Sequence, residues 1–569
     1  MEATFTSQGK ARPSIFSNTA LHSVALQDCL FLSLIVLLSL ILYVQRLGFY
    51  SDDWAFLGMF SNSQDQSIFG LFQSLYKESN ARMRPGLVLY LSGLYWLFGL
   101  HPLGYHVVNA VVFNALILLF YLTLRRLGQP RFLTLAVPLV YALLPNYSTD
   151  RFWYAAFQAN LSMALYFLSS YSDLRALEAR SARLWGWQLL SIFCLLVSIL
   201  SYEITVPLFA FNIFFIGYLI YRSRAVASSG PRARTILLAF QAAKLLTLAI
   251  VVLFKWLTTT HGIAQPGGML TQIIKVVRGA IHINYVSYGP GLLRALWRIF
   301  YYYPDREMFA LAGILALAIF CYLYYTISKS GNEWPSITFW LKVIVAGLFF
   351  VGLGYAIYVS TRDFMLAKTG ILNRVSIAAA VGVAVSLVGG FGLVSTLLRS
   401  DLLRKIVFSL SVALICTSGF LCINTLASMW AGAYRQEREV LADIQSRFPT
   451  LPAGSTLLLD GVCPYVGPAI VFESSWDLEG ALRTSYRNPT LKANVISPRI
   501  KIEEDGLSTH LYSESFRYPY DEKLLLYNFD QKKVYPLTDA EAARRYFQTF
   551  DPKLTDCPEG YEGRGVDVF

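Results

Sequence analysis

Residues 26–47 read LQDCLFLSLIVLLSLILYVQRL, and this stretch decides the fold class. A membrane-spanning helix needs roughly 20 consecutive, mostly apolar residues, and this stretch provides them. It is longer than the apolar core of a signal peptide, and no small-residue cleavage site follows it cleanly. We therefore interpret it as a retained first membrane helix.

Further apolar runs follow along the chain, which is 569 residues long and 55% hydrophobic. With the first run they make about eleven expected spans: 26–47, 104–124, 131–146, 154–171, 186–201, 204–221, 235–257, 307–327, 338–360, 372–397 and 405–430. The sequence therefore predicts a polytopic α-helical membrane protein. The net charge of +12 does not indicate nucleic-acid binding, because no lysine-rich stripe is present.

Much of the basic charge lies in short loops between the apolar runs. The loop Arg222–Arg234, for example, holds four arginines and no acid. Short loops rich in Lys and Arg favour the cytoplasmic side. This pattern predicts a cytoplasmic N-terminus and an extracytoplasmic C-terminus, in what we take to be a bacterial inner membrane.

This orientation divides the chain into two units. Residues 1–430 form the expected membrane unit, with outer loops 48–103 and 258–306, and residues 431–569 form a small α/β or α+β domain outside the membrane. Within the tail, the composition predicts short strands, a hairpin and a helix opened by a capping box: Thr456–Asp460, Ala469–Glu473, Leu524–Phe529 with Val534–Leu537, and Thr538 with Glu541. Chemistry is expected on the outer face, where the loop length is concentrated.

Two adjacent acids, Asp52 and Asp53, stand just beyond the first helix. The partial negative charge of the helix end and the neighbouring acid both disfavour ionisation, which suits a catalytic base. A structural alternative is that Ser51 or Asp52 caps a short helix starting at Trp54. The residues alone leave both readings open.

Arg82 and Arg84 precede an apolar segment, 86–100, that is short for a span. Pro85 suits the start of a helix, so we expect an interfacial helix lying against the membrane. Contact with lipid headgroups is an alternative role for either arginine.

These features together carry a resemblance. The phrase SDDWAFLG at 51–58, followed by RPGLVLYLSGLYWLFGLHPLGYHVVNA at 84–110, resembles the front end of bacterial GT-C glycosyltransferases. That superfamily includes protein O-mannosyltransferases and the lipid A aminoarabinose transferases. Ser201-Tyr202-Glu203 and Asn373-Arg374-Val375 resemble further family positions.

The resemblance implies an inverting transfer of a sugar from a polyprenyl-phosphate donor to a glycan, lipid or protein acceptor on the outer face. It implies Asp53, or failing it Asp52, as the base, and Arg374 as a ligand of the donor phosphate. Arg84 and the pair Arg294 and Arg298, which share one face of an amphipathic helix, are further phosphate candidates. No cofactor is certain, and a divalent metal held by Asp52 or Asp53 is an open option.

Two other charged residues lie close to apolar runs. Glu203 stands in a tight outer turn and is a candidate supporting acid, unless water simply reaches the turn. Lys244 lies inside a span and either pairs with an acid or marks a later helix start. In the tail, Cys463 and Cys557 can pair if that side is oxidising.

Two other classes of protein compete with this reading. A transporter or flippase would favour internal repeats and several deep charges, and the sequence shows no repeat. A surface-glycan polymerase or ligase would share the lipid-linked donor, but would be expected to concentrate its chemistry in a later outer loop.

Overall fold

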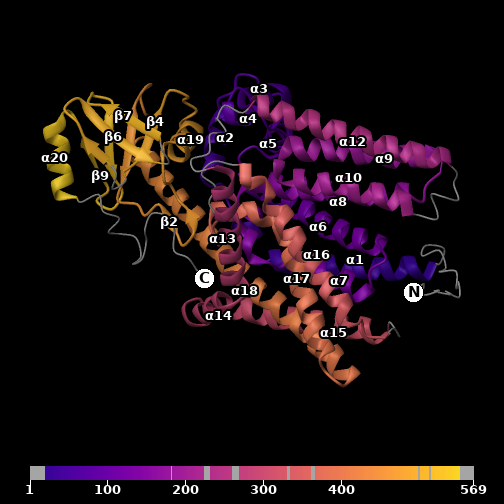
Figure 1. Ribbon diagram of the computed structural model, residues 1–569. Coiled ribbons are helices and arrows are strands. Elements are labelled where there is room, and N and C mark those ends of the chain that lie inside the picture. The colour runs from indigo at the N-terminus through magenta and orange to yellow at the C-terminus, as the bar shows by residue number, and fades with distance from the viewer. Residues whose placement is uncertain are drawn as a thin grey trace, which may run out of the picture.

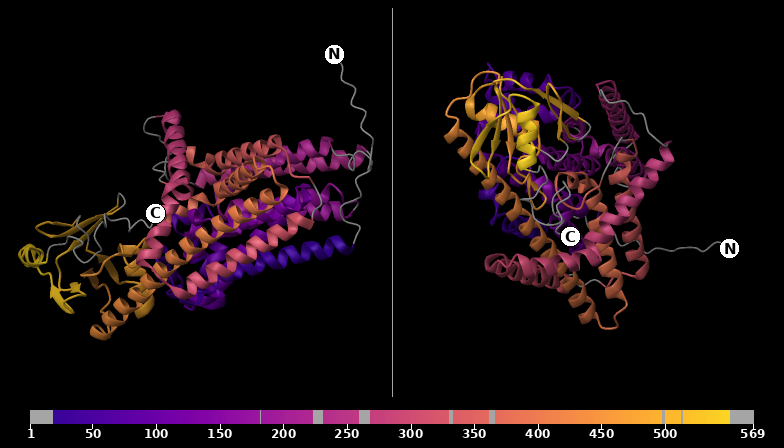
Figure 2. Two further views of the ribbon diagram at one scale, coloured as in Figure 1. Left: turned by 90° about the horizontal axis from the view of Figure 1, so that it is seen from below. Right: turned by 90° about the vertical axis from the view of Figure 1, so that its left-hand side faces the viewer.

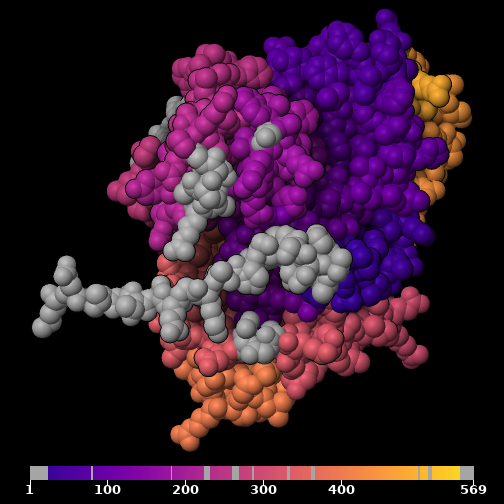
Figure 3. Space-filling model, turned by 90° about the vertical axis from the view of Figure 1, so that its right-hand side faces the viewer, coloured from indigo at the N-terminus to yellow at the C-terminus, as the bar shows by residue number. Residues whose placement is uncertain are grey.

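The computed structural model describes residues 19–180, 182–222, 231–258, 268–329, 333–360, 366–496, 500–511 and 514–550. Long helices run side by side in one bundle, and a strand-containing domain extends from one end of it (Figure 1). The two views in Figure 2 show the same arrangement. Seen from the other end, the helices from the first third of the chain form one side of the bundle (Figure 3).

In the described part of the chain, ten long helices form the bundle. They are α1 (Thr19–Leu40), α6 (Pro102–Arg126), α8 (Phe157–Ala176), α9 (Ala182–Ser201), α10 (Val206–Arg222), α12 (Pro231–Thr258), α15 (Arg306–Lys329), α16 (Ile337–Ala356), α17 (Ile377–Thr396) and α18 (Asp401–Arg447). A shorter helix, α7 (Arg131–Ala142), continues after a 67° bend into the 3-10 helix η2 (Pro145–Arg151).

Among the described residues, nine helices are long and apolar enough to cross a membrane, or ten if the bent pair α7–η2 counts as one span. The fold class is therefore a polytopic helical membrane protein, as the apolar runs predicted. The remaining predicted span, 154–171, corresponds to most of α8. This helix is buried on nearly every side and is not one of the nine or ten candidate spans. The count of eleven stays a prediction.

Buried ion pairs hold the bundle together. Near one end of the spans, the fully buried carboxylate of Asp28 accepts hydrogen bonds from Tyr121 (2.6 Å), Tyr322 (2.8 Å) and the Arg131 guanidinium (2.6 and 3.0 Å). Lys244 is ion-paired with Asp173, so the pairing alternative for this lysine is confirmed. A buried lysine with its own carboxylate has its charge balanced, which gives no support to a transport pathway.

The predicted first outer loop, 48–103, contains four helices, α2 (Asp52–Ser61), α3 (Ile68–Tyr76), α4 (Ser79–Arg82) and α5 (Pro85–Phe98). The expected helix over 86–100 is therefore confirmed as α5, with its proline in the first turn. The predicted second outer loop, 258–306, contains α13 (Gly268–Tyr288) and α14 (Pro290–Tyr302), which run across the ends of the spans (Figure 1). Short 3-10 helices join the spans at this end: η1 (Val44–Arg46), η3 (Tyr154–Ala156), η4 (Glu203–Thr205), η5 (Ile357–Ser360) and η6 (Ile371–Ser376).

The tail domain is built on a four-stranded sheet in the order β4-β1-β8-β9. Its strands β4 (Lys492–Val495) and β8 (Leu524–Asn528) both pair in parallel with the central β1 (Thr456–Asp460), and β9 (Lys533–Pro536) pairs antiparallel with β8. Helix α19 (Ser475–Tyr486) connects β1 to β4. The remaining elements are β2 (Tyr465–Val466), β3 (Ala469–Ile470), β5 (Ile500–Ile502), β6 (Gly506–Leu511), β7 (Glu514–Pro519) and α20 (Ala540–Thr549).

The predicted strand Thr456–Asp460 and the 524–537 hairpin are confirmed. The predicted strand Ala469–Glu473 is wrong in its length, since only Ala469–Ile470 is extended in a ladder. The predicted capping box is also wrong, because Asp539 and not Thr538 caps α20 by accepting a hydrogen bond from the backbone N–H of Ala542 (2.7 Å). Cys463 is disulfide-bonded, and Cys557 lies outside the described residues.

The bundle and the tail are joined in two ways. Helix α18 passes residue 430, the expected limit of the membrane unit, and continues without a break to Arg447. Helix α19 packs directly on α2, and the contact requires glycine on both sides. A side chain at Gly480 would collide with the backbone of Trp54, and one at Gly58 would lie 3.0 Å from Gly480 Cα. The tail therefore sits against the loop that carries Asp52 and Asp53.

Candidate functional site

The two adjacent acids of α2 have different surroundings. Asp53 is fully buried, and its two carboxylate oxygens accept hydrogen bonds from the backbone N–H groups of Tyr50 (2.9 Å) and Ala155 (2.8 Å). Burial raises the pKa of Asp53 well above its usual value, and these hydrogen bonds oppose the shift. Asp53 thus links the start of α2 to η3.

Asp52 lies on the partly exposed face of α2. Among the described residues no hydrogen bond to its carboxylate is formed, so both oxygens remain open to a ligand. Burial raises the pKa of Asp52, and the guanidinium of Arg374 acts in the opposite direction. A nearby cation keeps a partly desolvated carboxylate charged near neutral pH, and the charged carboxylate can then accept a proton from a substrate.

Arg374 is held in place by its own turn and by a neighbouring ring. Its Nη1 donates to the carbonyl of Ile371 (3.0 Å), and its guanidinium lies over the Trp153 ring at 4.8 Å from the centroid. Trp153 Nε1 donates to the carbonyl of Tyr50 (3.0 Å), just before the acid pair. The neighbouring Asn373 accepts from the N–H of Thr149 (3.2 Å) and so fixes η6 against η2. Contacts between segments far apart in sequence therefore link Arg374, through Trp153, to the backbone just before Asp52.

Asp150, in η2, is a site residue that the sequence reasoning missed. Its carboxylate is fully buried, and neither oxygen has a hydrogen-bond partner among the described residues. The charges that act on it are those of Arg374 and Arg151. The available signal was its place in a short outer turn directly beside Arg151.

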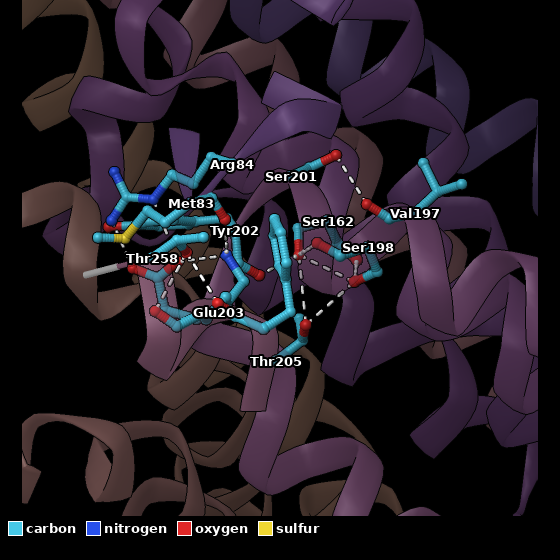
Figure 4. A network of polar contacts seen from close by, with 12 residues as sticks. Met83, Arg84, Ser162, Val197, Ser198, Ser201, Tyr202, Glu203, Thr205 and Thr258 are labelled. Carbon is cyan, nitrogen blue, oxygen red and sulfur yellow. Dashed lines mark hydrogen bonds and ion pairs between the residues drawn. The ribbon is translucent and has the colours of Figure 1, made fainter. Parts of the chain in front are cut away.

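A second cluster of charges surrounds Glu203 (Figure 4). Arg84 forms an ion pair with Glu203 and also donates from Nε to Glu203 Oε2 (3.1 Å). Lys255 Nζ lies 3.2 Å from Glu203 Oε2 and donates to the carbonyl of Met83 (2.9 Å). Burial lowers the pKa of Arg84, but the Glu203 carboxylate raises it by more, so the net pKa shift is upward and the guanidinium stays charged. Two cations thus share one acid, which leaves a net positive charge.

Tyr202 connects the two clusters. The Arg84 guanidinium lies over its ring at 5.0 Å. Burial raises the pKa of the Tyr202 phenol, while the charges of Arg374 and Arg84 lower it and those of Glu203 and Asp150 raise it. Charges from four separate segments of the chain therefore act on one phenol. Lys255 was not identified from the sequence, because a single lysine near the end of a span is an ordinary interface residue.

An apolar groove of about 550 Å³ lies between α13, α16 and α17. Its lining is almost wholly aliphatic, with a few polar groups that include Tyr288 and Tyr355. The Tyr355 hydroxyl is 3.2 Å from Ser376 Oγ, in the 3-10 helix that carries Arg374. The groove therefore ends close to the charged site.

The other predicted phosphate ligands, Arg294 and Arg298, lie on α14, and the expected amphipathic helix is present. This helix packs against α13 and α18, and the described contacts do not bring its arginines together with Asp52 or Arg374. Within the described ranges, no group of three or more His, Cys, Asp or Glu side chains could hold a metal ion.

Nine or ten apolar helices with a strand-containing tail define a polytopic membrane protein. No family model and no curated protein matches the sequence. The structure is similar to that of ArnT from Cupriavidus metallidurans in the apo state, at 15% identity and a TM-score of 0.33, over 83% of this chain and 86% of that chain.

The structure of ArnT from the same organism bound to undecaprenyl phosphate is similar to the same degree. The identity is 15% and the TM-score 0.33, over 84% of this chain and 86% of that chain. A likeness of this size does not assign an activity to the chain.

Proposed function

We propose that this protein is an inverting membrane glycosyltransferase that moves a sugar from a polyprenyl-phosphate donor to an acceptor. The observation that carries the proposal is that the charge of Arg374 acts both on the partly exposed acid Asp52 and on Tyr202, whose ring lies under Arg84, while an apolar groove ends close to the helix that carries Arg374. A lipid-phosphate sugar has the matching parts: an apolar chain, an anionic phosphate and a sugar that a base-activated nucleophile can attack.

The donor's phosphate is the group that needs cations. Negative charge grows on it as the bond between phosphate oxygen and anomeric carbon breaks, and fixed guanidinium groups stabilise that charge. Arg374 would bind it closest to Asp52, and the net positive charge of Arg84, Lys255 and Glu203 would attract it. The lipid chain would lie in the groove between α13, α16 and α17.

The acceptor's hydroxyl is the group that needs a base. Its oxygen would attack the anomeric carbon from the side opposite the phosphate, its proton would pass to the Asp52 carboxylate, and the lipid phosphate would leave. The transition state is expected to resemble an oxocarbenium ion, which nearby carboxylates stabilise. We propose Asp52 rather than Asp53 as the base, because the oxygens of Asp53 already accept backbone hydrogen bonds.

The charge pattern supports an N-terminus in the cytoplasm, and the site would then face the outer side with the tail domain. Reporter fusions at residue 228 and at the C-terminus test this orientation. An outer C-terminus and an inner residue 228 are expected. A cytoplasmic C-terminus would remove the orientation and the outer-face site together.

The direct test of function uses purified protein in nanodiscs with a polyprenyl-phosphate sugar labelled in the sugar. Time-dependent release or transfer of label by wild type, absent from Asp52→Asn, is expected. Binding of the donor without any sugar release by wild type would exclude the transferase and favour a lipid carrier. Transfer from a polyprenyl-diphosphate-linked glycan, with release of polyprenyl diphosphate, but not from the polyprenyl-phosphate sugar would instead indicate a polymerase or ligase.

A further inference from the structure

A second groove, of about 640 Å³, lies between the first outer loop and the tail domain. One wall is α2 with the segment that follows it and α3, and the other wall is α19. The glycine contact between Gly58 and Gly480 sets the distance between these walls. The groove exists only because the tail is docked on the loop that carries Asp52.

The groove lies on the same side of α2 as Asp52. Ala55 and Met59 line it, and both are partly exposed, as Asp52 is. Asp52 and Met59 are seven positions apart, which on an α-helix places them about 20° apart around the axis and about 10 Å apart along it. A molecule lying in the groove therefore extends along α2 toward the Asp52 carboxylate.

The lining has the chemistry of a carbohydrate site rather than of a lipid or phosphate site. It offers one partly exposed indole, Trp476, and the amide side chains of Asn62, Gln64 and Gln73. Indole rings stack on the apolar faces of sugar rings, and amides both donate to and accept from hydroxyls. Gln64 and Gln73 are exposed and form no hydrogen bond within the described part of the chain, so their amides remain available.

The charges of the groove are balanced. Asp65 and Glu479 oppose Lys77 and Arg483, and Arg483 is ion-paired with Glu479 (2.6 Å). A neutral lining gives no net attraction to a polyanion, in contrast to the positive site around Tyr202. The volume lies within the range of pockets that hold small organic ligands, about 300–1,000 Å³.

We propose that this groove binds a neutral oligosaccharide, which is the acceptor or the part of the acceptor next to the reacting hydroxyl. The assignment as acceptor rests on the proposed transferase function, and the binding of the glycan does not. The tail domain then supplies specificity, by giving α19 as one wall of the acceptor site.

The test measures binding of three neutral trisaccharides, maltotriose, cellotriose and chitotriose, to the full-length protein in nanodiscs by saturation-transfer NMR and calorimetry. Trp476→Ala and the exposed Gln73→Ala are the groove variants. Trp96→Ala is the matched control, because Trp96 is 58% exposed on α5 and lies outside the groove. Loss of the indole contact is expected to weaken binding roughly 3- to 10-fold.

Saturable binding of at least one trisaccharide, weakened in both groove variants and unchanged in the control, supports the groove. No binding by wild type, or equal binding by the groove variants, overturns it. Glycan binding that persists while no donor sugar is transferred removes the transferase and leaves the groove. Sugar transfer with an unchanged acceptor KM in both groove variants removes the groove and leaves the transferase.

Discussion

The charge of the Arg374 guanidinium lowers the pKa of the Asp52 carboxylate, although the two residues come from the start of a late span and from the loop that follows the first helix. Trp153 links them, because its ring lies under the Arg374 guanidinium and its indole N–H donates to Tyr50. The Arg374 guanidinium and the backbone just before Asp52 therefore contact one shared aromatic side chain. This relationship determines how the two adjacent acids should differ.

Asp52→Asn and Asp53→Asn should fail in different ways. Removing a general base typically costs about 10²- to 10⁴-fold in rate, so Asp52→Asn should lose transfer and keep its stability. In Asp53→Asn, the amide NH₂ would face a backbone N–H that now donates to a carboxylate oxygen. Leaving that donor unsatisfied costs about 1–3 kcal/mol, so the melting temperature should fall. Turnover and melting of both variants, measured side by side, check this.

The opposite pattern would reverse the assignment. If Asp53→Asn were fully stable and inactive while Asp52→Asn kept near-normal transfer, Asp53 would be the base. If both stayed active, the acid-pair mechanism would be wrong.

The pH profile should report on the pair of Asp52 and Arg374. Burial raises the pKa of Asp52 above 3.8, so kcat/KM should fall with decreasing pH through a value above that of an ordinary Asp. Arg374→Ala removes the charge that lowers this pKa, so the acidic limb should move to higher pH. Arg374→Lys keeps the positive charge, so the acidic limb of its pH profile should stay closer to that of wild type. Its donor binding should be weaker, because lysine cannot form the two parallel hydrogen bonds that a guanidinium makes to a phosphate.

An acidic limb that is identical in wild type and Arg374→Ala would show that Arg374 does not act on the titrating group. The profiles are measured with the labelled donor over a range in which the protein stays folded, and circular dichroism at each pH provides the control.

Arg84 and Glu203 should be energetically coupled. Their side chains form a partly buried ion pair, in which 27% of the Arg84 side chain and 24% of the Glu203 side chain are exposed. A double-mutant cycle of Arg84→Gln and Glu203→Gln should give an interaction energy of about 0.5–3 kcal/mol in thermal unfolding. The pair Arg545 and Glu541, exposed on α20, is the control and should give almost none. Strict additivity at Arg84 and Glu203 would contradict the coupling.

Asp28→Asn should destabilise the bundle. One buried carboxylate there holds α1 to α6, α7 and α15 through Tyr121, Arg131 and Tyr322. Removing one partner of a buried ion pair typically costs about 3–5 kcal/mol. Asp401→Asn is a matched control, because the Asp401 side chain is 60% exposed and, among the described residues, its ion pair is with Lys405 in the same helix. Equal melting temperatures for the two variants would show that Asp28 has no such role.

The sequence by itself determined the class of the protein and most of its elements. A run of about 20 apolar residues has to form a helix in a membrane, because no water is there to satisfy its backbone groups. This constraint is local, so the spans, the α5 helix led by Pro85 and the 524–537 hairpin could be read directly from the chain. The motifs around Asp52, Glu203 and Arg374 were also visible as separate pieces.

Only the tertiary structure decided how those pieces meet. Adjacent acids look equivalent in a sequence, and the backbone N–H of Ala155, from another segment, gives Asp53 its separate role. Asp150 and Lys255 became candidate site residues because the charge of Asp150, in η2, acts on Tyr202 and because α12 brings Lys255 to Glu203. The groove between α2 and α19 depends on a contact between two glycines from distant segments. Such relationships depend on packing between distant segments, which local hydrophobic periodicity does not encode.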